Sequence, residues 1–214
     1  FTEEREAMVE RQLRRRGIGD SAILDAFLEV PREIFVSPDY AHLAYGDYPL
    51  PIEAGQTISQ PFMVAMMIEA AGIGPDDKVL EVGAGSGYAA AVISRIARKV
   101  VGIERQHDLV DIARRRLDQL RYRNVEIIEG DGTKGYPEEA PFDAILAAAS
   151  GSHVPEPLID QLREGRCIVM PIGQPGWPQE LLKVTKRADG TVETQDLGGV
   201  RFVPLIGEEG WKDA

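Results

Sequence analysis

The sequence predicts an α/β fold built on a doubly wound, mostly parallel sheet of seven strands with an antiparallel C-terminal edge. From residue 78 onward, short apolar runs alternate with helix-like segments. This alternation is typical of parallel strands that are covered by helices on both faces. The last quarter of the chain differs, because two strand-like segments there are separated by turn residues such as Asp189 and Gly190, which favours antiparallel pairing.

The region before the sheet is expected to be helical at first and then irregular. Helices are expected at residues 2–16, 21–29 and 61–71. Gly17 ends the first helix, Pro31 follows the second, and Pro61 suits the first turn of the third. Residues 31–60 are rich in proline and glycine, so we expect mostly loop there, and a loop of that length inside a domain is usually functional.

The sheet is expected to contain parallel strands followed by an antiparallel pair. The parallel strands are expected at residues 79–82, 100–103, 125–128, 142–146 and 167–170, and the antiparallel pair at 180–187 and 199–205. Helices are expected between the parallel strands at residues 88–97, 107–120 and 156–163. The length suits one good-sized core. We therefore expect a single domain over residues 1–214, with residues 1–60 as a helical and loop extension that covers the site.

The charge and composition argue against several classes of partner. The net charge is −11, from 24 basic and 35 acidic residues, and such a surface repels nucleic-acid phosphates. No window approaches the roughly 18 apolar residues of a membrane helix, and the first residues lack the apolar core of a signal peptide. The single cysteine, Cys167, reads as a buried strand residue and fits a reducing cytoplasm. Three scattered histidines build no familiar metal site. We expect a cytoplasmic protein without a metal, a nucleic-acid partner or a membrane anchor.

Three glycines stand at the junction between the first strand of the expected sheet and the helix after it. The segment reads Glu81-Val82-Gly83-Ala84-Gly85-Ser86-Gly87-Tyr88. Glycines let the backbone turn tightly and let a ligand approach closely. A plain turn needs only one glycine, so three of them favour a ligand-binding loop. A dinucleotide fingerprint would place its third glycine at position 88, where this chain has Tyr88.

Two carboxylates at strand ends narrow the choice of ligand. Glu81 comes just before the glycines, where it would repel a pyrophosphate but suits an ammonium group such as that of S-adenosylmethionine. Glu104 ends the next strand, 21 residues after Gly83, where a carboxylate can accept hydrogen bonds from both ribose hydroxyls. Glu104 alone would also suit NAD, or could be a solvated acid at a strand end. Glu81 and the glycine spacing are what favour S-adenosylmethionine.

A third candidate ligand-binding position lies at the end of the next strand. The segment Gly130-Asp131-Gly132 comes after residues 125–128, and an aspartate there can accept a hydrogen bond from an adenine amino group. By itself this tripeptide is also ordinary turn chemistry. All three positions lie at the carboxyl ends of successive strands, where open α/β sheets bind their ligands.

These features resemble the class I S-adenosylmethionine-dependent methyltransferases, whose fold is Rossmann-like. Further motifs narrow the resemblance to the protein-L-isoaspartate O-methyltransferase family, and they occur in the expected order along nearly the whole chain. The motifs are Val30-Pro31-Arg32-Glu33-Ile34-Phe35-Val36, Gln56-Thr57-Ile58-Ser59-Gln60-Pro61, Gly130-Asp131-Gly132-Thr133-Lys134-Gly135 and Val200-Arg201-Phe202-Val203-Pro204-Leu205. The resemblance implies a monomeric enzyme that methylates the free carboxylate of L-isoaspartyl residues in damaged proteins and peptides, which starts their repair to aspartyl.

The resemblance also implies roles for individual residues. It assigns the methionine end of the cofactor to Glu81, Gly83 and Gly85, the ribose to Glu104 and the adenine side to Asp131 and Gly132. It assigns cofactor binding at the reaction centre to Thr57, Ile58 and Ser59, and the substrate peptide to Val200, Phe202 and Val203. Ser59 is the residue that the family treats as catalytic. By position alone, Ser59 would be an ordinary helix cap before Pro61.

The implied chemistry asks little of the protein beyond positioning. An isoaspartyl carboxylate is ionised at neutral pH, so no general base is needed, and Ser59 would hydrogen-bond that carboxylate and orient it. Alignment of this kind can lower a barrier by roughly 7–11 kcal/mol. We expect residues 37–55 and 199–205 to hold the backbone of the peptide, because an isoaspartyl linkage differs from a normal one by a backbone methylene.

Two segments depart from the family pattern. The chain reads Ala147-Ala148-Ala149-Ser150-Gly151-Ser152-His153 where the family has alanines followed by a proline, beside the expected site. Gly165 stands alone where the family usually has two glycines, which we interpret as a shortened loop. Three alternatives therefore stay open: a methyltransferase of this fold with another small-molecule or protein acceptor, an inactive protein that keeps the cofactor pocket, and a nicotinamide-dependent oxidoreductase, which Tyr88 and Glu81 disfavour.

Overall fold

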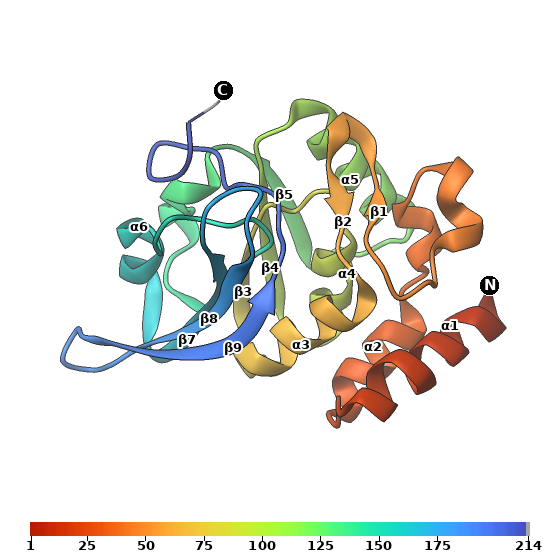
Figure 1. The fold of residues 1–214 in the computed structure, drawn as a ribbon, viewed down its shortest axis with the longest axis horizontal. Helices are drawn as coiled ribbons and strands as arrows, with labels where there is room; N and C mark the ends of the chain where they lie inside the picture. Colours follow the sequence, from red (N-terminus) through yellow and green to blue (C-terminus); the bar gives the residue numbers. More distant parts are fainter. Residues whose placement is uncertain (213–214) are drawn as a thin grey trace.

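Seven strands form one sheet, in the order β5-β4-β3-β6-β7-β8-β9 (Figure 1). The computed structural model describes residues 1–212. The strands are β3 Lys78–Val82, β4 Lys99–Glu104, β5 Val125–Glu129, β6 Phe142–Ala147, β7 Leu162–Ile172, β8 Gln179–Lys186 and β9 Val192–Val200. Strands β3 to β7 run parallel, while β8 and β9 join in antiparallel pairs. The predicted fold class is thus confirmed, including its antiparallel edge.

The order of the strands reverses beside β3, and this reversal places the site. The chain passes outward from β3 to β4 and β5, then returns to the other side of β3 with β6 and β7. Ligands of open α/β sheets bind in the crevice that such a reversal creates at the carboxyl ends of the strands. The glycines at residues 83–87 follow β3 directly, so they lie at this crevice.

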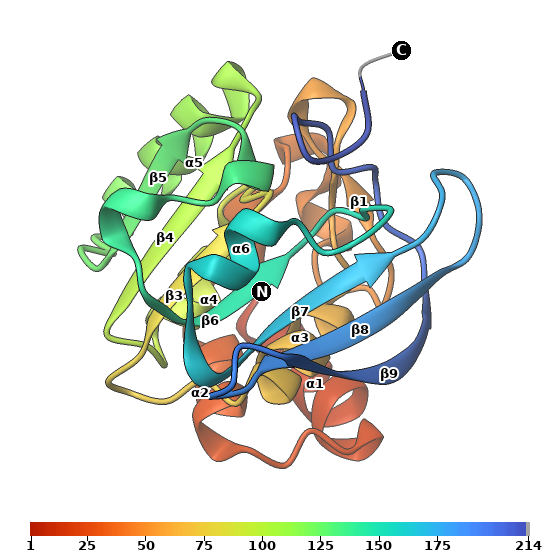
Figure 2. The same cartoon turned by 90° about the vertical axis from the view of Figure 1, so that its left-hand side faces the viewer.

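Helices cover both faces of the sheet (Figures 1 and 2). The main helices are α1 Thr2–Met8, α2 Ser21–Glu29, α3 Pro61–Ala71, α4 Tyr88–Ser94, α5 His107–Gln119 and α6 Glu156–Asp160. Side chains of α1 to α5 share one hydrophobic cluster with strand residues such as Val79 and Val100. Leu158 of α6 belongs to a second cluster on the opposite face, with Leu80 and Val101. This alternation follows from the strand period of two.

The first helical segment has more than one geometry. An α-helix occupies Thr2–Met8, a π-helical turn Val9–Leu13 and a 3-10 turn Arg14–Arg16. Gly17 ends the segment as predicted, with a φ of 103°, a conformation that glycine adopts without a steric cost. The predicted second and third helices begin and end as expected. Among residues 1–212, no helix is long and apolar enough to cross a membrane.

Residues 31–60 are mostly irregular, as predicted, with short ordered pieces. They contain 3-10 turns at Arg32–Phe35, Pro38–Leu43 and Glu53–Gly55, and the two-residue strands β1 Leu50–Pro51 and β2 Thr57–Ile58. Strands β1 and β2 pair antiparallel, with Leu50 opposite Ile58. This small hairpin brings Thr57 and Ile58 back toward the sheet.

Three predicted boundaries are wrong. Helices α4 and α6 are shorter than expected, and α6 stops at Asp160 because β7 already begins at Leu162. The predicted strand at residues 199–205 is instead β9 at Val192–Val200. Beyond Val200 the chain leaves the sheet and crosses toward the carboxyl ends of the central strands, and only an isolated bridge joins Pro204 to Ser150.

The supposed shortened loop around Gly165 is also wrong, because this residue lies inside β7. Gly165 has a φ of 76°, and the pairing of β6 with β7 shifts register between Phe142 and Ala144. Arg166 takes the place of the second glycine. Its Nε donates to the Asp143 carbonyl (2.6 Å), and its guanidinium pairs with Asp77.

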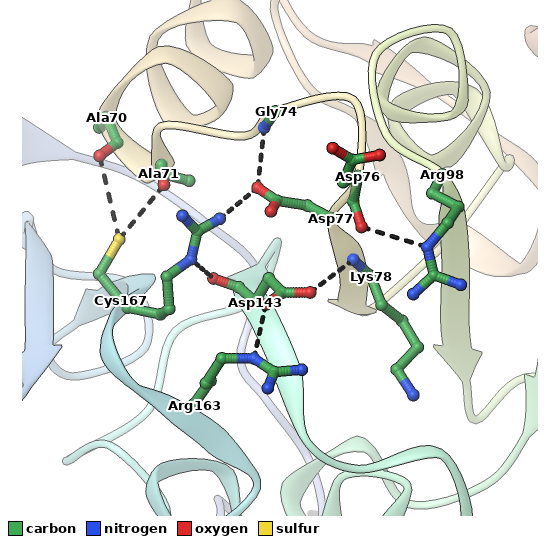
Figure 3. Close-up of polar contacts among 11 residues, drawn as sticks. Ala70, Ala71, Gly74, Asp76, Asp77, Lys78, Arg98, Asp143, Arg163 and Cys167 are labelled. Atoms are coloured by element: carbon green, nitrogen blue, oxygen red, sulfur yellow. Dashed lines mark hydrogen bonds and ion pairs between the residues drawn. The ribbon is translucent and has the colours of Figure 1, made fainter.

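Asp143 joins several elements at the amino ends of the strands (Figure 3). Its carboxylate accepts from the Lys78 backbone N–H (2.9 Å) and from Arg163 Nε (2.8 Å). Burial would raise the pKa of Asp143, but the Lys78 N–H and Arg163 outweigh it and hold the pKa below its ordinary value. This network stabilises the end of the sheet that lies away from the glycines.

Candidate active site

The glycine loop has the backbone that only glycines adopt easily. Gly83, Gly85 and Gly87 have φ values of 83°, 53° and 86°. The N–H groups of Gly83 and Ala84 both donate to the Ile103 carbonyl at 2.9 and 3.0 Å, which holds the loop against the end of β4. Helix α4 begins directly afterwards at Tyr88. The loop therefore makes the tight backbone turn that the sequence predicted between this strand and the helix after it.

Glu81 is a buried carboxylate beside this loop. Only 3% of its surface is exposed, and Oε2 is buried without a hydrogen-bond partner. Burial raises the pKa of Glu81 to about 8, the charge of Glu104 adds to the rise, and the Ala90 backbone N–H opposes it. A buried carboxyl group of this kind gains most from a cationic ligand, which would favour its ionised form.

Glu104 lies at the end of β4 and shapes the loop as well as the cavity. Its Oε2 accepts from the Gly85 N–H and its Oε1 from the Gln106 N–H, both at 2.9 Å. A carboxylate oxygen has a second acceptor position. Glu104 can thus hold Gly85 in place and still bind hydroxyl groups of a ligand.

Two cavities adjoin the glycine loop. A small one of about 50 Å³ is lined by residues that include Ser59, Glu81, Gly83, Gly85 and Tyr88. A larger one of about 300 Å³ is lined by residues that include Gly83, Gly85, Glu104, Gly132 and Val203. Both cavities share Thr57 and Ala148 in their walls. The structure thus brings both carboxylates, two of the loop glycines and β2 together around two neighbouring cavities that share wall residues.

Gly132 fits tightly behind this region, whereas Asp131 lies to one side. A Cβ on Gly132 would come within 2.6 Å of Val82 Cγ1, so no side chain is accommodated there. The Asp131 carboxylate accepts from Thr133 and from the Glu208 N–H (2.8 Å). Asp131 lines a separate, more open hollow of about 800 Å³ that includes residues 206–208. The structure therefore does not bring the Asp131 carboxylate into the cavity that Glu104 and Gly132 line.

Ser59 lies where the small cavity meets an open groove. The groove has a volume of about 620 Å³ and is lined by residues that include Ser59, Gln60, Met63, Val200, Phe202 and Val203. Helix α3 is capped by Gln60 and has no side-chain cap hydrogen bond, so Ser59 is not the helix cap that its position alone suggested. Thr57 and Ala148 also line the groove. The three candidate peptide-binding residues thus face the same hollow as Ser59.

A buried glutamine fixes the chain on the far side of the groove. Gln179 Oε1 accepts from the Phe202 N–H (2.7 Å), and its Nε2 donates to the Phe202 carbonyl (3.2 Å). The side chain of Gln179 is buried and replaces the strand pairing that ends at Val200. This contact explains how Phe202 satisfies its main-chain groups after the chain has left the sheet at Val200.

The unusual segment at residues 150–153 has a structural role. The Ser150 N–H donates to the Val203 carbonyl (2.8 Å), and the Ser150 carbonyl accepts from the Leu205 N–H (2.8 Å) and from Trp211 Nε1 (2.9 Å). Ser152 Oγ lies 2.9 Å from His153 Nδ1, and both side chains are exposed. Ser150 thus anchors the C-terminal segment, and residues 150–153 line neither the cavities at the glycine loop nor the groove.

The arrangement matches one family over almost the whole chain. The family profile described as protein-L-isoaspartate(D-aspartate) O-methyltransferase matches residues 3–210. The chain belongs to this family. The protein-L-isoaspartate O-methyltransferase 2 of Pelobacter propionicus is 51% identical over 97% of this chain and 92% of its own length. The protein-L-isoaspartate O-methyltransferase of Methanoculleus marisnigri is 52% identical over 98% of this chain and 94% of its own.

Solved structures of the family have the same fold. A protein-L-isoaspartate O-methyltransferase that is 33% identical superposes with a TM-score of 0.89 over 96% of this chain and 67% of its own. A candidate member from Plasmodium falciparum, crystallised with S-adenosyl-L-homocysteine, is 29% identical and has a TM-score of 0.81 over 94% of this chain and 98% of its own. The family resemblance and the methyltransferase fold that the sequence predicted are confirmed.

Sequence reasoning missed three residues that shape the site. Ala148 lines both cavities and the groove, but an alanine after a strand carries no chemical signal. Gln179 holds Phe202 through a side chain that the pattern of β8 does not distinguish from a surface glutamine. Arg32 was noted only within a motif, although it is completely buried and donates to the Ser59 carbonyl.

Proposed function

We propose that this member of the family transfers a methyl group from S-adenosylmethionine to the free carboxylate of L-isoaspartyl residues in damaged proteins and peptides. This transfer starts the repair of the residue to aspartyl, because the methyl ester can then cyclise without an enzyme. The proposal rests on the family membership over residues 3–210 and on one structural observation. That observation is the position of Ser59 between the cavity that reaches Glu81 and the groove beside Val200.

The described residues fit the cofactor. Glu81 Oε2 is a buried acceptor without a partner, which suits a ligand that carries an ammonium group. We assign the methionine end to Glu81, Gly83 and Gly85, the ribose to Glu104 and the adenine side to Gly132 and Asp131. Asp131 has acceptor positions left beside its bonds to Thr133 and Glu208, and it would reach the ligand from the edge of the cavity. When bound, S-adenosylmethionine supplies a methyl carbon that its positively charged sulfur activates.

The protein's own part of the reaction is to hold and orient the carboxylate. We assign Ser59 to this role, with Thr57 and Ile58 beside it on β2. An isoaspartyl carboxylate is ionised at neutral pH, so no residue has to remove a proton. The Ser59 hydroxyl would donate a hydrogen bond to one carboxylate oxygen, and the walls at Thr57 and Ala148 would exclude water. Such alignment is among the largest contributions that a protein can make to a reaction of this kind.

We assign the groove to the peptide on either side of the isoaspartyl residue. Val200, Phe202 and Val203 line it with apolar side chains, and the chain beyond Val200 is no longer paired in the sheet. Main-chain groups in an extended segment can pair with any peptide sequence, which suits a repair enzyme. The clamp between Gln179 and Phe202 supports this assignment because it keeps the segment rigid.

We also propose the domain organisation, the oligomeric state and the cellular location of the protein. Residues 1–60 would be an extension of a single methyltransferase domain that covers the site, which is supported by the packing of Phe27 and Phe35 against Tyr88 in one hydrophobic cluster. The enzyme would act as a cytoplasmic monomer on peptides and proteins. The net charge of −11 argues against nucleic acid as a substrate.

Repair itself provides a test. A peptide that contains one L-isoaspartyl residue is incubated with the enzyme and S-adenosylmethionine, and its conversion to the aspartyl peptide is followed by chromatography. We expect the aspartyl form to accumulate over repeated rounds of methylation. Ser59→Ala should lower turnover by roughly 10- to 100-fold with little change in cofactor affinity. Unchanged turnover would remove Ser59 from the proposed role.

A further inference from the structure

A buried arginine connects three parts of the protein beneath the reaction centre. Arg32 begins the 3-10 turn Arg32–Phe35 and has no exposed surface. Its Nε donates to the Ala44 carbonyl at 2.7 Å, and its Nη2 donates to the Ser59 carbonyl at 2.9 Å. The guanidinium carbon lies 4.7 Å from the centre of the Tyr88 ring.

Two of the residues that Arg32 contacts, Ser59 and Tyr88, belong to the candidate active site. Ser59 directly follows β2 and lines both the small cavity and the groove. Tyr88 is the first residue of α4 and follows the glycine loop, and its ring is fixed by Phe27 and Phe35 at 6.1 and 5.6 Å between centres. Arg32 therefore joins the main chain of Ser59 to the start of the helix that carries the glycine loop.

A buried cation in this place is a costly way to stabilise a fold. Arg32 Nη1 and Tyr88 Oη are both buried without hydrogen-bond partners. Burial lowers the pKa of Arg32, although Tyr88 acts against this. No carboxylate forms an ion pair with Arg32 among residues 1–212, and apolar residues of similar volume often stabilise a core as well or better. The planar guanidinium of Arg32 has a geometric use, because its spaced N–H donors can hold two carbonyls at fixed positions at once.

We propose that Arg32 is a positioning residue for methyl transfer: its guanidinium holds the Ser59 carbonyl against Tyr88 and so sets the Ser59 hydroxyl relative to the glycine loop. This inference rests on the proposed role of Ser59. Arg32 itself touches neither the groove nor the cavities at the glycine loop. It acts through the backbone of Ser59, so it should affect turnover rather than cofactor affinity.

A double-mutant cycle between Arg32 and Ser59 tests the proposal. Arg32→Lys keeps the charge but replaces the planar guanidinium with a single ammonium group, so the two carbonyls are no longer held by spaced donors in a fixed geometry. We expect Arg32→Lys to lower kcat on an isoaspartyl peptide by roughly 10- to 100-fold, with the Kd for S-adenosyl-L-homocysteine within about threefold of the wild type. If Arg32 acts through Ser59, adding Arg32→Lys to Ser59→Ala should lower kcat by no more than about twofold further.

Arg166→Lys is the matched control for loss of stability. Arg166 also donates through Nε to a carbonyl, at 2.6 Å from Asp143 O, but at the opposite ends of the strands. We expect Arg166→Lys to lower the Tm while leaving kcat unchanged. Should Arg32→Lys fail to fold, Arg32→Gln takes its place in the cycle, because it keeps one donor and buries no charge.

The outcomes separate this proposal from the function on which it rests. If Ser59→Ala alone leaves kcat unchanged, the role of Ser59 fails and the positioning role fails with it. If Ser59→Ala lowers kcat but Arg32→Lys does not, only the role of Arg32 is refuted. If both lower kcat and the double variant shows the full product of the two effects, Arg32 acts independently of Ser59 and the proposal is wrong.

Discussion

Glu81→Gln is expected to stabilise the protein without ligand at neutral pH while weakening its hold on the cofactor. Burial and the charge of Glu104 raise the pKa of Glu81 to about 8 from an ordinary value of 4.5. Between these two values the unfolded chain releases the proton and the folded protein keeps it. The folded state therefore loses about 1.4 kcal/mol relative to the unfolded state for each pH unit, or about 3 kcal/mol at pH 7. Glutamine does not titrate and escapes this loss.

Urea unfolding of both proteins between pH 4.5 and 8.5 measures the effect. The free energy of unfolding of the wild type should fall relative to that of Glu81→Gln as the pH rises, and the change should level off above about pH 8. At pH 7 the variant should gain roughly 6–12 °C in Tm for a chain of this size. A difference between the two proteins that is the same at every pH would refute the reasoning, because the glutamine would then act through packing.

Adding the cofactor should make the wild type more stable than Glu81→Gln. A ligand stabilises the folded protein in proportion to the logarithm of its concentration over Kd. Because the ammonium group favours the ionised form of Glu81, S-adenosylmethionine should bind the wild type more tightly as the pH rises from 6 to 8. The variant should show a smaller gain in Tm from the cofactor and no such pH dependence. Equal gains in both proteins would contradict the assignment of Glu81 to the methionine end.

Three further predictions follow from single contacts. Glu104→Gln should weaken S-adenosyl-L-homocysteine binding by roughly 10- to 100-fold in calorimetry, because the ribose hydroxyls would lose a charged acceptor and so would the Gly85 and Gln106 N–H groups; unchanged affinity would refute the ribose assignment. Gln179→Ala releases Phe202 and should raise the KM of an isoaspartyl peptide severalfold with cofactor affinity unchanged. An unaltered KM would show that residues 199–203 do not bind the substrate. Asp143→Asn should lower the Tm at pH 7 by roughly 2–8 °C, or about 1–2 kcal/mol. Since the folded pKa of Asp143 is depressed, this stability is present above the unfolded pKa and is lost as the pH falls through the folded pKa, so the gap should close on acidification.

The sheet could be predicted from sequence because its signals are local. Apolar runs such as Val100–Ile103 alternate with amphipathic helices, and β3 to β6 lie where expected. The glycine loop and the acids at 81 and 104 could be predicted for the same reason, since the ends of parallel strands meet at one edge. The structure adds that these residues line two neighbouring cavities with shared wall residues.

The parts that could not be predicted depend on contacts between distant residues. The segment after Val200 has the apolar pattern of a strand, but the Gln179 side chain takes the hydrogen bonds of Phe202, and the Ser150 main chain takes those of Val203 and Leu205. Asp131 matched a motif, yet its carboxylate accepts a hydrogen bond from the N–H of Glu208, which lies 77 residues further along the chain. Gly165 suggested a loop, whereas Arg166 reaches Asp77 and the strand continues. None of these contacts can be recognised from the local pattern of apolar and polar residues.

The most direct test of the proposed reaction is transfer of radiolabelled methyl from S-adenosylmethionine to two peptides that differ only in one residue. One peptide contains L-isoaspartate and the other contains normal aspartate. We expect label on the isoaspartyl peptide alone, in an ester that base hydrolyses to release labelled methanol. No label on either peptide, from a protein that still binds the cofactor, would contradict the proposed function and would direct the search to another acceptor.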